Sequence, residues 1–490
     1  MNRMKQTYRS SLMLLTDLYQ LTMAYGYWKH GCHKDRAAFH AYFRKNPFGG
    51  GFTLSCGLAE VLEVLSDFRF DQSDLAYLAT LTGNDGQPLF DQEFLAFLKT
   101  LRISLDLEAI PEGTVIFPNE PLIRVTGPIL QCQLVETILL NIVNFQTLIA
   151  TKAARICLAA KGDAVFEFGL RRAQGIDGAL AASRAAYIGG CVATSNVLAG
   201  KLFGIPVRGT HAHSWVMSFD DELQAFEAYA AAMPNNCVFL VDTYDTLEGV
   251  RRAAAVGIRL RESGHKMVGI RLDSGDLAYL SIEARKILDT AGLNDAIIIA
   301  SNDLDETIIE SLKLQGATIA LWGVGTNLVT GAGQSALGGV YKLTAEQGKD
   351  STWIRKVKAS DVTSKSSIPG LLQVRRFTQA GNIVADAIFD EILGIGPVPT
   401  IVDPADPLRR KTIPVGVDAE DLLVPVMRDG KLLDETSSLQ TIQARAKTQI
   451  NALYPGITRF TNPHNYPVGL EEGLAAVRTE MLLKAKEHRS

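Results

Sequence analysis

Residues 166–219 of this 490-residue chain read FEFGLRRAQGIDGALAASRAAYIGGCVATSNVLAGKLFGIPVRGTHAHSWVMSF. The stretch begins with an apolar strand that ends in two arginines at 171–172, and it closes with a second strand that leads into His211 and His213. Fixed positive charge at one strand end and imidazole groups at the other predict chemistry on an anionic substrate. Core packing needs neither kind of side chain, because charged residues are rarely buried without a partner.

The same pattern of an apolar run, a polar or glycine-rich end and a helical stretch recurs from about residue 163 to residue 343. Near-continuous apolar strands that alternate with helices predict a parallel sheet covered on both faces. We therefore predict an α/β fold centred on an irregular, closed or nearly closed α/β barrel, with an open doubly wound sheet as the alternative. The seven runs lie at 164–169, 205–210, 237–244, 267–273, 296–303, 318–326 and 336–343.

The flanks of this central region have a different pattern. Segments 36–56 and 104–130 are rich in strand formers and turn signals, 344–370 is polar and lysine-rich like a loop or lid, and 428–431 is a hairpin signal. A second α/β domain built from both ends of the chain is predicted. The expected boundaries are 1–135 for the N-terminal α/β domain, 136–343 for the catalytic barrel, and 344–490 for a lid-like loop and a C-terminal segment that packs with the N-terminal domain.

Composition limits the classes of function. The chain is 47% hydrophobic and 21% charged with a net charge of -4, so no global field attracts nucleic acid or an anionic membrane. Polar residues interrupt the apolar runs at 1–20 and 128–150, which argues against a signal peptide and a membrane span. The six cysteines are scattered without a CxxC pair, which argues against a disulfide framework and a zinc knuckle. We expect a cytoplasmic protein with no nucleic-acid or membrane partner.

Polar residues follow most of the predicted strands, and catalytic groups of α/β barrels lie at the C-terminal ends of strands. The segment 271–276 combines an arginine with a glycine turn and favours a phosphate or sugar contact, although its aspartates could also cap a helix. Segment 323–325 starts like a dinucleotide fingerprint, but Leu328 replaces the third glycine, so a glycine-lined phosphate cradle is favoured. The strand-end residues are Arg171, Arg172, Thr210, His211, His213, Asp242, Arg271, Asp273, Asp276, Ser301, Asn302, Asp303, Gly325 and Thr326.

The pair His211 and His213 allows two interpretations. An HxH pair at a strand end can hold a metal in a hydrolase, but that site needs ligands on later strands, and His265 precedes its strand. Alternatively, one of the two histidines is a nucleophile or general base.

Read in order, these motifs resemble the nicotinate phosphoribosyltransferase family. The resemblance rests on TDLYQLTMAYGYW (16–28), FEFGLRRAQGIDGAL, GTHAHSW, RLDSGDL, SNDLDE, GVGTNLVT and LGGVYKL, and it extends through FRKNPF (43–48) and VKASDVTSKSSIPG (357–370). It implies a type II phosphoribosyltransferase barrel. The implied reaction combines nicotinate with phosphoribosyl pyrophosphate to give nicotinate mononucleotide and pyrophosphate, coupled to ATP hydrolysis, in the salvage route of NAD biosynthesis. It also implies Mg²⁺ as cofactor and a homodimer with shared active sites.

The resemblance further implies roles for individual residues. His213 takes the position that ATP phosphorylates, whereas His211 takes a variable position of the motif. Tyr19 is expected to stack on the pyridine ring from the partner subunit. The other implied roles are contacts of Arg171, Thr210 and Arg271 with nicotinate or neighbouring phosphates, a 5′-phosphate loop at Gly325 and Thr326, and Mg²⁺ ligation by Asp273 and Asp276, directly or through water.

Ser195 bears on which pyridine is the substrate. The related nicotinamide phosphoribosyltransferases carry an aspartate at the position that we align with Ser195, and an aspartate would repel the carboxylate of nicotinate. A serine hydroxyl would not, so nicotinate is the expected substrate. The alternatives are nicotinamide as substrate, a metal-dependent hydrolase that uses the HxH pair, and a catalytically silent regulatory protein on the same scaffold.

Overall fold

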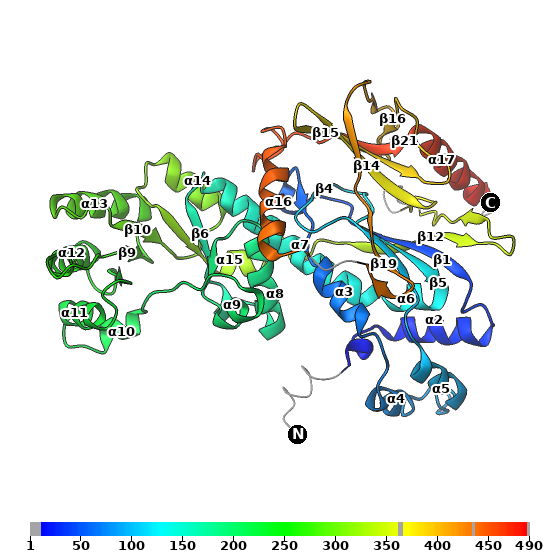
Figure 1. Ribbon diagram of the computed structural model, residues 1–490, viewed down its shortest axis with the longest axis horizontal. Helices are drawn as coiled ribbons and strands as arrows, with labels where there is room; N and C mark the ends of the chain where they lie inside the picture. The colour runs from blue at the N-terminus through cyan, green and yellow to red at the C-terminus, as the bar shows by residue number, and fades with distance from the viewer. Residues whose placement is uncertain (1–10, 361–365, 434–436, 488–490) are drawn as a thin grey trace. The chain divides into compact units, whose positions relative to one another are not determined.

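The computed structural model describes residues 11–360, 366–433 and 437–487 (Figure 1). These residues form two compact units. Unit 2 comprises Leu148–Ser335 together with Leu439–Lys447, and unit 1 comprises the other described residues. The chain passes between the units within helix α7 (Glu136–Ala159) and within helix α16 (Leu439–Asn451).

Unit 2 is built on a six-stranded parallel sheet with the order β7-β6-β11-β10-β9-β8. This confirms an α/β fold with a parallel sheet. Strands β7 and β8 form the edges, and no pairing among the described residues closes the sheet, so a closed barrel stays a prediction. The strands are β6 (Ala164–Glu167), β7 (Ala193–Thr194), β8 (Val238–Leu240), β9 (Gly269–Leu272), β10 (Ile297–Ala300) and β11 (Leu321–Val324).

The helices of unit 2 alternate with these strands as the sequence pattern predicts. Helices α12 and α13 pack against β9 and β10 (Figure 1), and Asp245, Asp276 and Asp305 cap the first turns of α12, α13 and α14 by accepting backbone N–H bonds. The helices are α8 (Gly175–Ile188), α9 (Val197–Phe203), α10 (His213–Met217), α11 (Glu222–Ala232), α12 (Thr246–Glu262), α13 (Leu277–Thr290), α14 (Glu306–Leu314) and α15 (Thr326–Val329).

Two of the seven predicted runs do not form strands of this sheet. Run 205–210 contributes only one parallel bridge, between Val207 and Thr194. Run 336–343 was wrongly assigned to the parallel sheet, because β12 (Val340–Gln347) pairs antiparallel with β1 (Arg36–Tyr42) in unit 1. A parallel connection needs a crossover, usually a helix, and the chain between β11 and β12 contains only the four-residue helix α15.

Unit 1 contains two larger sheets with the orders β13-β12-β1-β5-β3-β19-β20 and β17-β16-β21-β15-β14-β18, and a two-stranded sheet of β2 and β4. Its strands are β2 (Thr53–Leu54), β3 (Asp106–Ala109), β4 (Val115–Ile116), β5 (Ile123–Pro128), β13 (Trp353–Arg355), β14 (Leu372–Gln379), β15 (Asn382–Asp390), β16 (Thr400–Val402), β17 (Arg410–Thr412), β18 (Asp418–Asp421), β19 (Val424–Arg428), β20 (Lys431–Leu432) and β21 (Val468–Glu471). The strand-rich segments 36–56 and 104–130 are confirmed.

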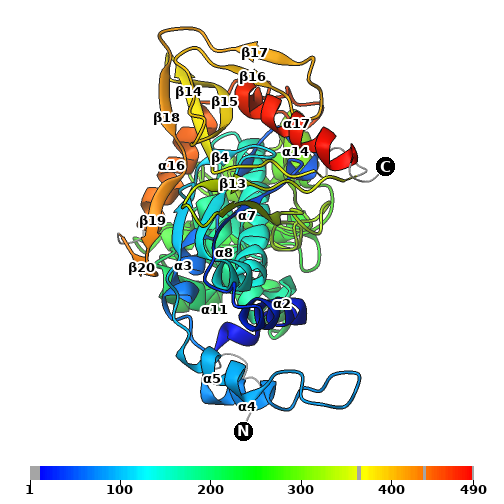
Figure 2. The same cartoon turned by 90° about the vertical axis from the view of Figure 1, so that its right-hand side faces the viewer.

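Helices of unit 1 include α2 (Leu18–Lys29), α3 (Leu58–Ser66), α4 (Gln72–Leu78), α5 (Gln92–Thr100), α6 (Ile129–Leu134) and α17 (Glu472–Glu487). Helix α17 packs against β16 and β21, as Figure 2 also shows for β16. The predicted hairpin at 428–431 joins β19 to β20, and Asp429 and Gly430 both have the positive φ that its tight turn requires (46° and 71°).

Parts of three sequence predictions fall outside the described residues. These are residues 1–10 of the N-terminal segment, 361–365 of the lid-like segment, and 434–436 and 488–490 of the C-terminal segment. Within the described residues, no helix combines the length and the apolar character that a membrane span requires.

Candidate functional site

A pocket of about 440 Å³ lies in unit 2 where the strands of the parallel sheet end. Because parallel strands run the same way, the loops that follow them meet at one edge of the sheet. Seven of the ten predicted site residues line this pocket: Arg171, Ser195, Thr210, Arg271, Asp273, Gly325 and Thr326. The remaining lining residues are Phe168, Arg172, Gly209, His211, Ala212, Ser301, Asn302, Asp303 and Gly323.

Three guanidinium groups give the pocket its positive charge. Arg171 and Arg172 are exposed in a short 3₁₀ turn after β6, whereas Arg271 is half-buried at the end of β9. Arg271 donates a hydrogen bond to the Thr210 hydroxyl, and its Nε atom is buried without a partner among the described residues. Burial lowers the pKa of Arg271, with a smaller contribution from Arg171. An arginine nevertheless remains protonated at neutral pH, so these groups outnumber the two lining carboxylates.

A buried glutamate that sequence reasoning missed organises the first two strand ends. Glu167 is 1% exposed, and its carboxylate accepts hydrogen bonds from the Gly169 N–H, the Ser183 hydroxyl (2.8 Å) and the Thr194 hydroxyl (2.6 Å). The Ser195 N–H donates to the Glu167 carbonyl oxygen at 2.9 Å. One side chain thus fixes the start of the arginine turn and the strand that presents Ser195. The sequence feature that could have revealed this role is the presence of a charged residue, Glu167, inside the otherwise apolar run 164–169.

His211 is a core residue. It is 8% exposed, its ring packs edge-on against Tyr229 at 4.9 Å, and its Nε2 atom accepts a hydrogen bond from the Leu240 N–H at 3.3 Å. Burial lowers the pKa of His211 to about 4, so the ring is neutral at physiological pH. Neither a charge nor a free Nε2 atom is left for chemistry.

His213 is the more available of the two histidines. Its side chain is 39% exposed, with Nδ1 3.1 Å from the Thr243 hydroxyl and Nε2 3.8 Å from Oδ2 of Asp273. His213 does not line the pocket itself, but its Nε2 atom lies beside Asp273, which does. This arrangement orients the ring and leaves Nε2 facing the carboxylate side of the site.

Three aspartates near the end of β9 have different roles. Asp273 accepts a hydrogen bond from the Ser301 hydroxyl, and its N–H donates to Asp242 Oδ2 at 2.8 Å. The other oxygen of Asp242, Oδ1, is buried without a partner among the described residues. One oxygen of Asp276 caps α13, and Asp276 does not line the pocket. Asp242 was recognised as a strand-end residue but left out of the predicted site.

These carboxylates fit Mg²⁺ better than zinc. Mg²⁺ is bound by one or two carboxylates and keeps several waters, and Asp242 and Asp273 can supply those oxygens. A structural or catalytic zinc needs three or four protein ligands. In the described part of the chain, no group of three or more His, Cys, Asp or Glu residues is arranged to hold a metal. The HxH pair therefore has no supporting ligand set there.

Glycines and one unusual backbone conformation leave space for a ligand at the floor of the pocket. A Cβ atom on Gly323 would lie 2.6 Å from the Phe168 ring, so any larger residue here would force that ring to shift. Asn302 has φ of 121°, a conformation that costs energy for a residue with a side chain and that often marks a functional site. Gly325 and Thr326 follow directly at the end of β11, where the main chain can approach a ligand closely.

Tyr19 lies in unit 1 on α2. Its side chain is 49% exposed, and partial burial followed by the charge of Glu136 raises the pKa of its hydroxyl. Neighbouring apolar side chains are also exposed, namely Leu15 at 51%, Leu18 at 52% and Met23 at 41%. An exposed apolar group of this kind is typical of a protein contact surface.

Comparison with known proteins gives one family over most of the chain. Residues 14–144 match the model of the nicotinate phosphoribosyltransferase N-terminal domain, 164–377 match that of the nicotinate phosphoribosyltransferase family, and 373–478 match that of the C-terminal domain. A nicotinate phosphoribosyltransferase of Bacillus subtilis is 43% identical over 469 residues, which cover 94% of this chain and 93% of that protein. One of Dictyostelium discoideum is 40% identical over 94% of this chain and 86% of that protein.

A solved structure agrees with the sequence relatives. The crystal structure of human nicotinic acid phosphoribosyltransferase superposes with a TM-score of 0.83 at 33% identity, covering 95% of this chain and 99% of that one.

Proposed function

Because this chain belongs to the nicotinate phosphoribosyltransferase family and is a transferase, we propose that it transfers the phosphoribosyl group of phosphoribosyl pyrophosphate to nicotinate. The products are nicotinate mononucleotide, a precursor in NAD biosynthesis, and pyrophosphate. The observation that carries the proposal is the pocket at the strand ends of unit 2, where Arg171, Arg271 and Ser195 come together.

The charge of the pocket suits this reaction. Breaking the bond between C1 of the ribose and pyrophosphate builds positive charge on the sugar and negative charge on the leaving group. Preorganised cations that face the leaving group therefore lower the barrier, and the protein contributes positioning and electrostatic stabilisation rather than covalent chemistry. Arg271, held by Thr210, is the cation with a fixed orientation, and the backbone around Gly325 and Thr326 would cradle the 5′-phosphate.

The lining favours nicotinate over nicotinamide, which is the alternative substrate. A planar guanidinium binds a carboxylate through two parallel hydrogen bonds, and Arg171 and Arg172 offer such groups. Ser195 contributes a neutral hydroxyl where an aspartate would repel the acid. The ring of Phe168 provides an apolar surface for the pyridine ring.

Asp273 and Asp242 are the residues that would hold Mg²⁺, with Asp276 reaching it through water because one of its oxygens caps α13. The ion, when bound, neutralises charge on pyrophosphate. The Ser301 hydroxyl also donates a hydrogen bond to Asp273, which orients its carboxylate.

ATP coupling is assigned to His213. Nδ1 is oriented by Thr243, so Nε2 is the atom that attacks the γ-phosphorus of ATP, forming a P–N bond and releasing ADP. Water later cleaves that bond and returns histidine and inorganic phosphate. While it is present, the phosphoryl group adds negative charge beside Asp273, which changes the electrostatics of the pyrophosphate site. His211 cannot take this role, since its Nε2 accepts from Leu240.

The proposal extends to assembly, cellular location and sheet closure. The exposed apolar residues of α2 and the segment before it would form the contact of a cytoplasmic homodimer, in which Tyr19 of each subunit stacks on the pyridine ring bound by the other. The parallel sheet is taken as part of an irregular barrel, and the bridge from Val207 to β7 supports a further strand position beyond that edge.

The test compares nicotinate with nicotinamide as acceptor for phosphoribosyl pyrophosphate, with and without ATP, by following pyrophosphate release. We expect product from nicotinate, more of it with ATP, and an acid-labile phosphoryl group on the protein. His213→Ala should abolish that group, and His265→Ala, a control histidine that pairs with Asn235, should keep it. If product formed with nicotinamide but not with nicotinate, the substrate assignment would be wrong. If His213→Ala kept the phosphoryl group, the assignment of ATP coupling to His213 would be wrong.

A further inference from the structure

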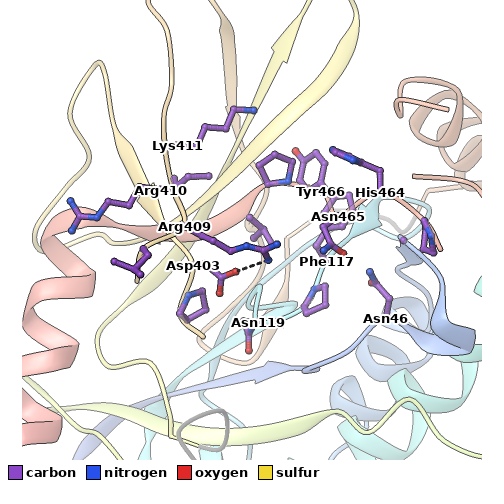
Figure 3. A pocket seen from close by; sticks show the side chains of 18 of the residues that line it. Asn46, Phe117, Asn119, Asp403, Arg409, Arg410, Lys411, His464, Asn465 and Tyr466 are labelled. Carbon is purple, nitrogen blue, oxygen red and sulfur yellow. Dashed lines mark ion pairs between the residues drawn. The ribbon is translucent and has the colours of Figure 1, made fainter. Parts of the chain in front are cut away.

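Unit 1 contains a second and larger pocket, of about 860 Å³, between the β16–β17 hairpin and the loop that precedes β21 (Figure 3). We call it the Arg409 pocket, after the arginine that Figure 3 shows extending into it from the hairpin. It shares no lining residue with the pocket of unit 2. Its volume lies within the range of small-molecule sites, which is about 300–1,000 Å³.

Among the described residues, the Arg409 pocket is lined by more cations than carboxylates. Arg409, Arg410, Lys411 and Arg459 line it, against Asp403 alone. Some of these cations are already engaged: Arg410 pairs with Glu472 at 2.9 Å, and Lys411 donates to a backbone carbonyl.

Arg409 and Arg459 are the two guanidinium groups available to a ligand. Arg409 is 64% exposed, and its nearest acid, Asp403, is 3.8 Å away, which is too long for a good hydrogen bond (dashed in Figure 3). Arg459 donates to the Gly456 carbonyl oxygen and has no carboxylate within ion-pair distance among the described residues. Both groups therefore keep donors free.

Uncharged polar side chains also line the Arg409 pocket. The side-chain amides of Asn119 and Asn465 lie at the pocket in Figure 3, and neither makes a hydrogen bond to another described residue. Asn119 also holds the uncommon φ of 71°, which fixes where its side chain starts. Amide N–H groups beside guanidinium groups form the usual donor set for phosphate oxygens.

The wall behind the pocket is formed by stacked aromatic rings. Phe117 stacks on Tyr466 with ring centroids 3.8 Å apart, and behind them the fully buried Arg376 pairs with Asp386. Glu120 is also buried there, and burial followed by the nearby Asp386 raises the pKa of Glu120 well above its ordinary value. The Arg376–Asp386 pair is neutral overall, and the exposed cations of the pocket are those at its rim.

We propose that the Arg409 pocket is a binding site for a phosphate-bearing, multiply charged small molecule, separate from the transfer site of unit 2. Concave shape, two available guanidinium groups, unpartnered amides and a neutral aromatic wall occur together here. A solvated basic surface would also present guanidinium groups, but it requires neither the concave shape nor the amides and the aromatic wall. The planar fork of an arginine binds two oxygens of one phosphate through paired N–H bonds, which a point charge such as a lysine ammonium does not offer.

The test measures binding of inorganic tripolyphosphate to the full chain by isothermal titration calorimetry. Since the transfer site also attracts polyphosphate, the titration is run on wild type, on Arg271→Ala and on the double variant Arg409→Glu/Arg459→Glu. We expect a saturable site that survives Arg271→Ala and is weakened at least about tenfold in the double variant, as the loss of charge-assisted hydrogen bonds implies. Phosphoribosyl transfer by the double variant should stay at the wild-type level.

A matched control is Arg69→Glu, which reverses an arginine of similar exposure (62%) elsewhere in unit 1 and should leave tripolyphosphate affinity unchanged. If the double variant does not fold, Arg409→Gln gives the same readout, because an exposed side chain with one weak ion pair contributes little to stability. Equal affinity in wild type and the variant overturns the proposal, as does loss of all binding in Arg271→Ala. Tighter binding of citrate than of tripolyphosphate overturns the phosphate assignment.

Discussion

The buried imidazole of His211 makes a quantitative prediction about stability and pH. The pKa of this group is about 4 in the folded protein, against an ordinary value of 6.5. Above 6.5 both folded and unfolded chains hold the ring neutral. As the pH falls below 6.5, the unfolded chain takes up a proton that the folded chain refuses, so stability decreases until the pH reaches about 4.

The size of this effect follows from the two pKa values. Their difference, at about 1.4 kcal/mol per pH unit, corresponds to roughly 3 kcal/mol of unfolding free energy. That is a large part of the stability of a typical protein, about 5–15 kcal/mol. Protonation would also break the hydrogen bond from the Leu240 N–H, since a protonated Nε2 cannot accept.

The assay compares urea unfolding of wild type and His211→Gln at several pH values between about 4 and 8. Glutamine offers an acceptor to Leu240 but does not titrate, so the stability advantage of wild type should shrink by about 3 kcal/mol as the pH falls through this window. Hydrogen exchange of the peptide that contains Leu240 gives a local readout of the same event. Ser195→Ala, a non-titrating change in the same pocket, should follow the wild-type pH dependence. A stability difference between wild type and His211→Gln that stays constant across this pH range would show that His211 does not titrate with a lowered pKa in the folded protein.

Three further predictions concern other buried positions. Gly323→Ala would place a methyl group 2.6 Å from the Phe168 ring and should weaken substrate binding, seen as a higher KM; an unchanged KM would show that the pocket floor can yield. Glu306→Gln removes the carboxylate that pairs with buried Lys152 at 2.7 Å and should cost about 3–5 kcal/mol in urea unfolding, whereas a loss under 1 kcal/mol would count against the pair. The pKa of Glu120 is raised in the folded protein, so its contribution to the free energy of unfolding is full below pH 4.5 and falls as the pH rises. Glu120→Gln, which does not titrate, should therefore become more stable relative to wild type with increasing pH. Parallel plots of unfolding free energy against pH for the two proteins would contradict this.

Much of unit 2 could be predicted from local sequence. A strand buried on both faces of a parallel sheet must be apolar throughout, so runs such as 237–244 and 296–303 stand out in the chain. Because parallel strands end at one edge, the polar residues after those runs were expected to meet, and Arg171, Thr210, Arg271 and Asp273 do line one pocket.

Other features depended on contacts distant in sequence. Run 336–343 is as apolar as the rest, yet its partner β1 lies about three hundred residues earlier, and no local pattern reveals that pairing. Glu167 was missed because its role arises from three donors on separate elements. The helix-capping alternative for the aspartates of 271–276, which is a local contact, is borne out for Asp276, since one of its oxygens caps the first turn of α13.

Local sequence was therefore enough to predict the family, the α/β alternation and the residue types gathered at the strand ends. The family resemblance already implied that His213, not His211, is phosphorylated, but the physical difference between these two residues of one motif became visible only in the folded chain. Burial against Tyr229 and a hydrogen bond from Leu240 keep His211 neutral and occupied, while His213 faces Asp273 with a free nitrogen. The physical reason is that a side chain's protonation and accessibility are set by the groups packed around it, and those groups come from strands and helices that local sequence does not identify.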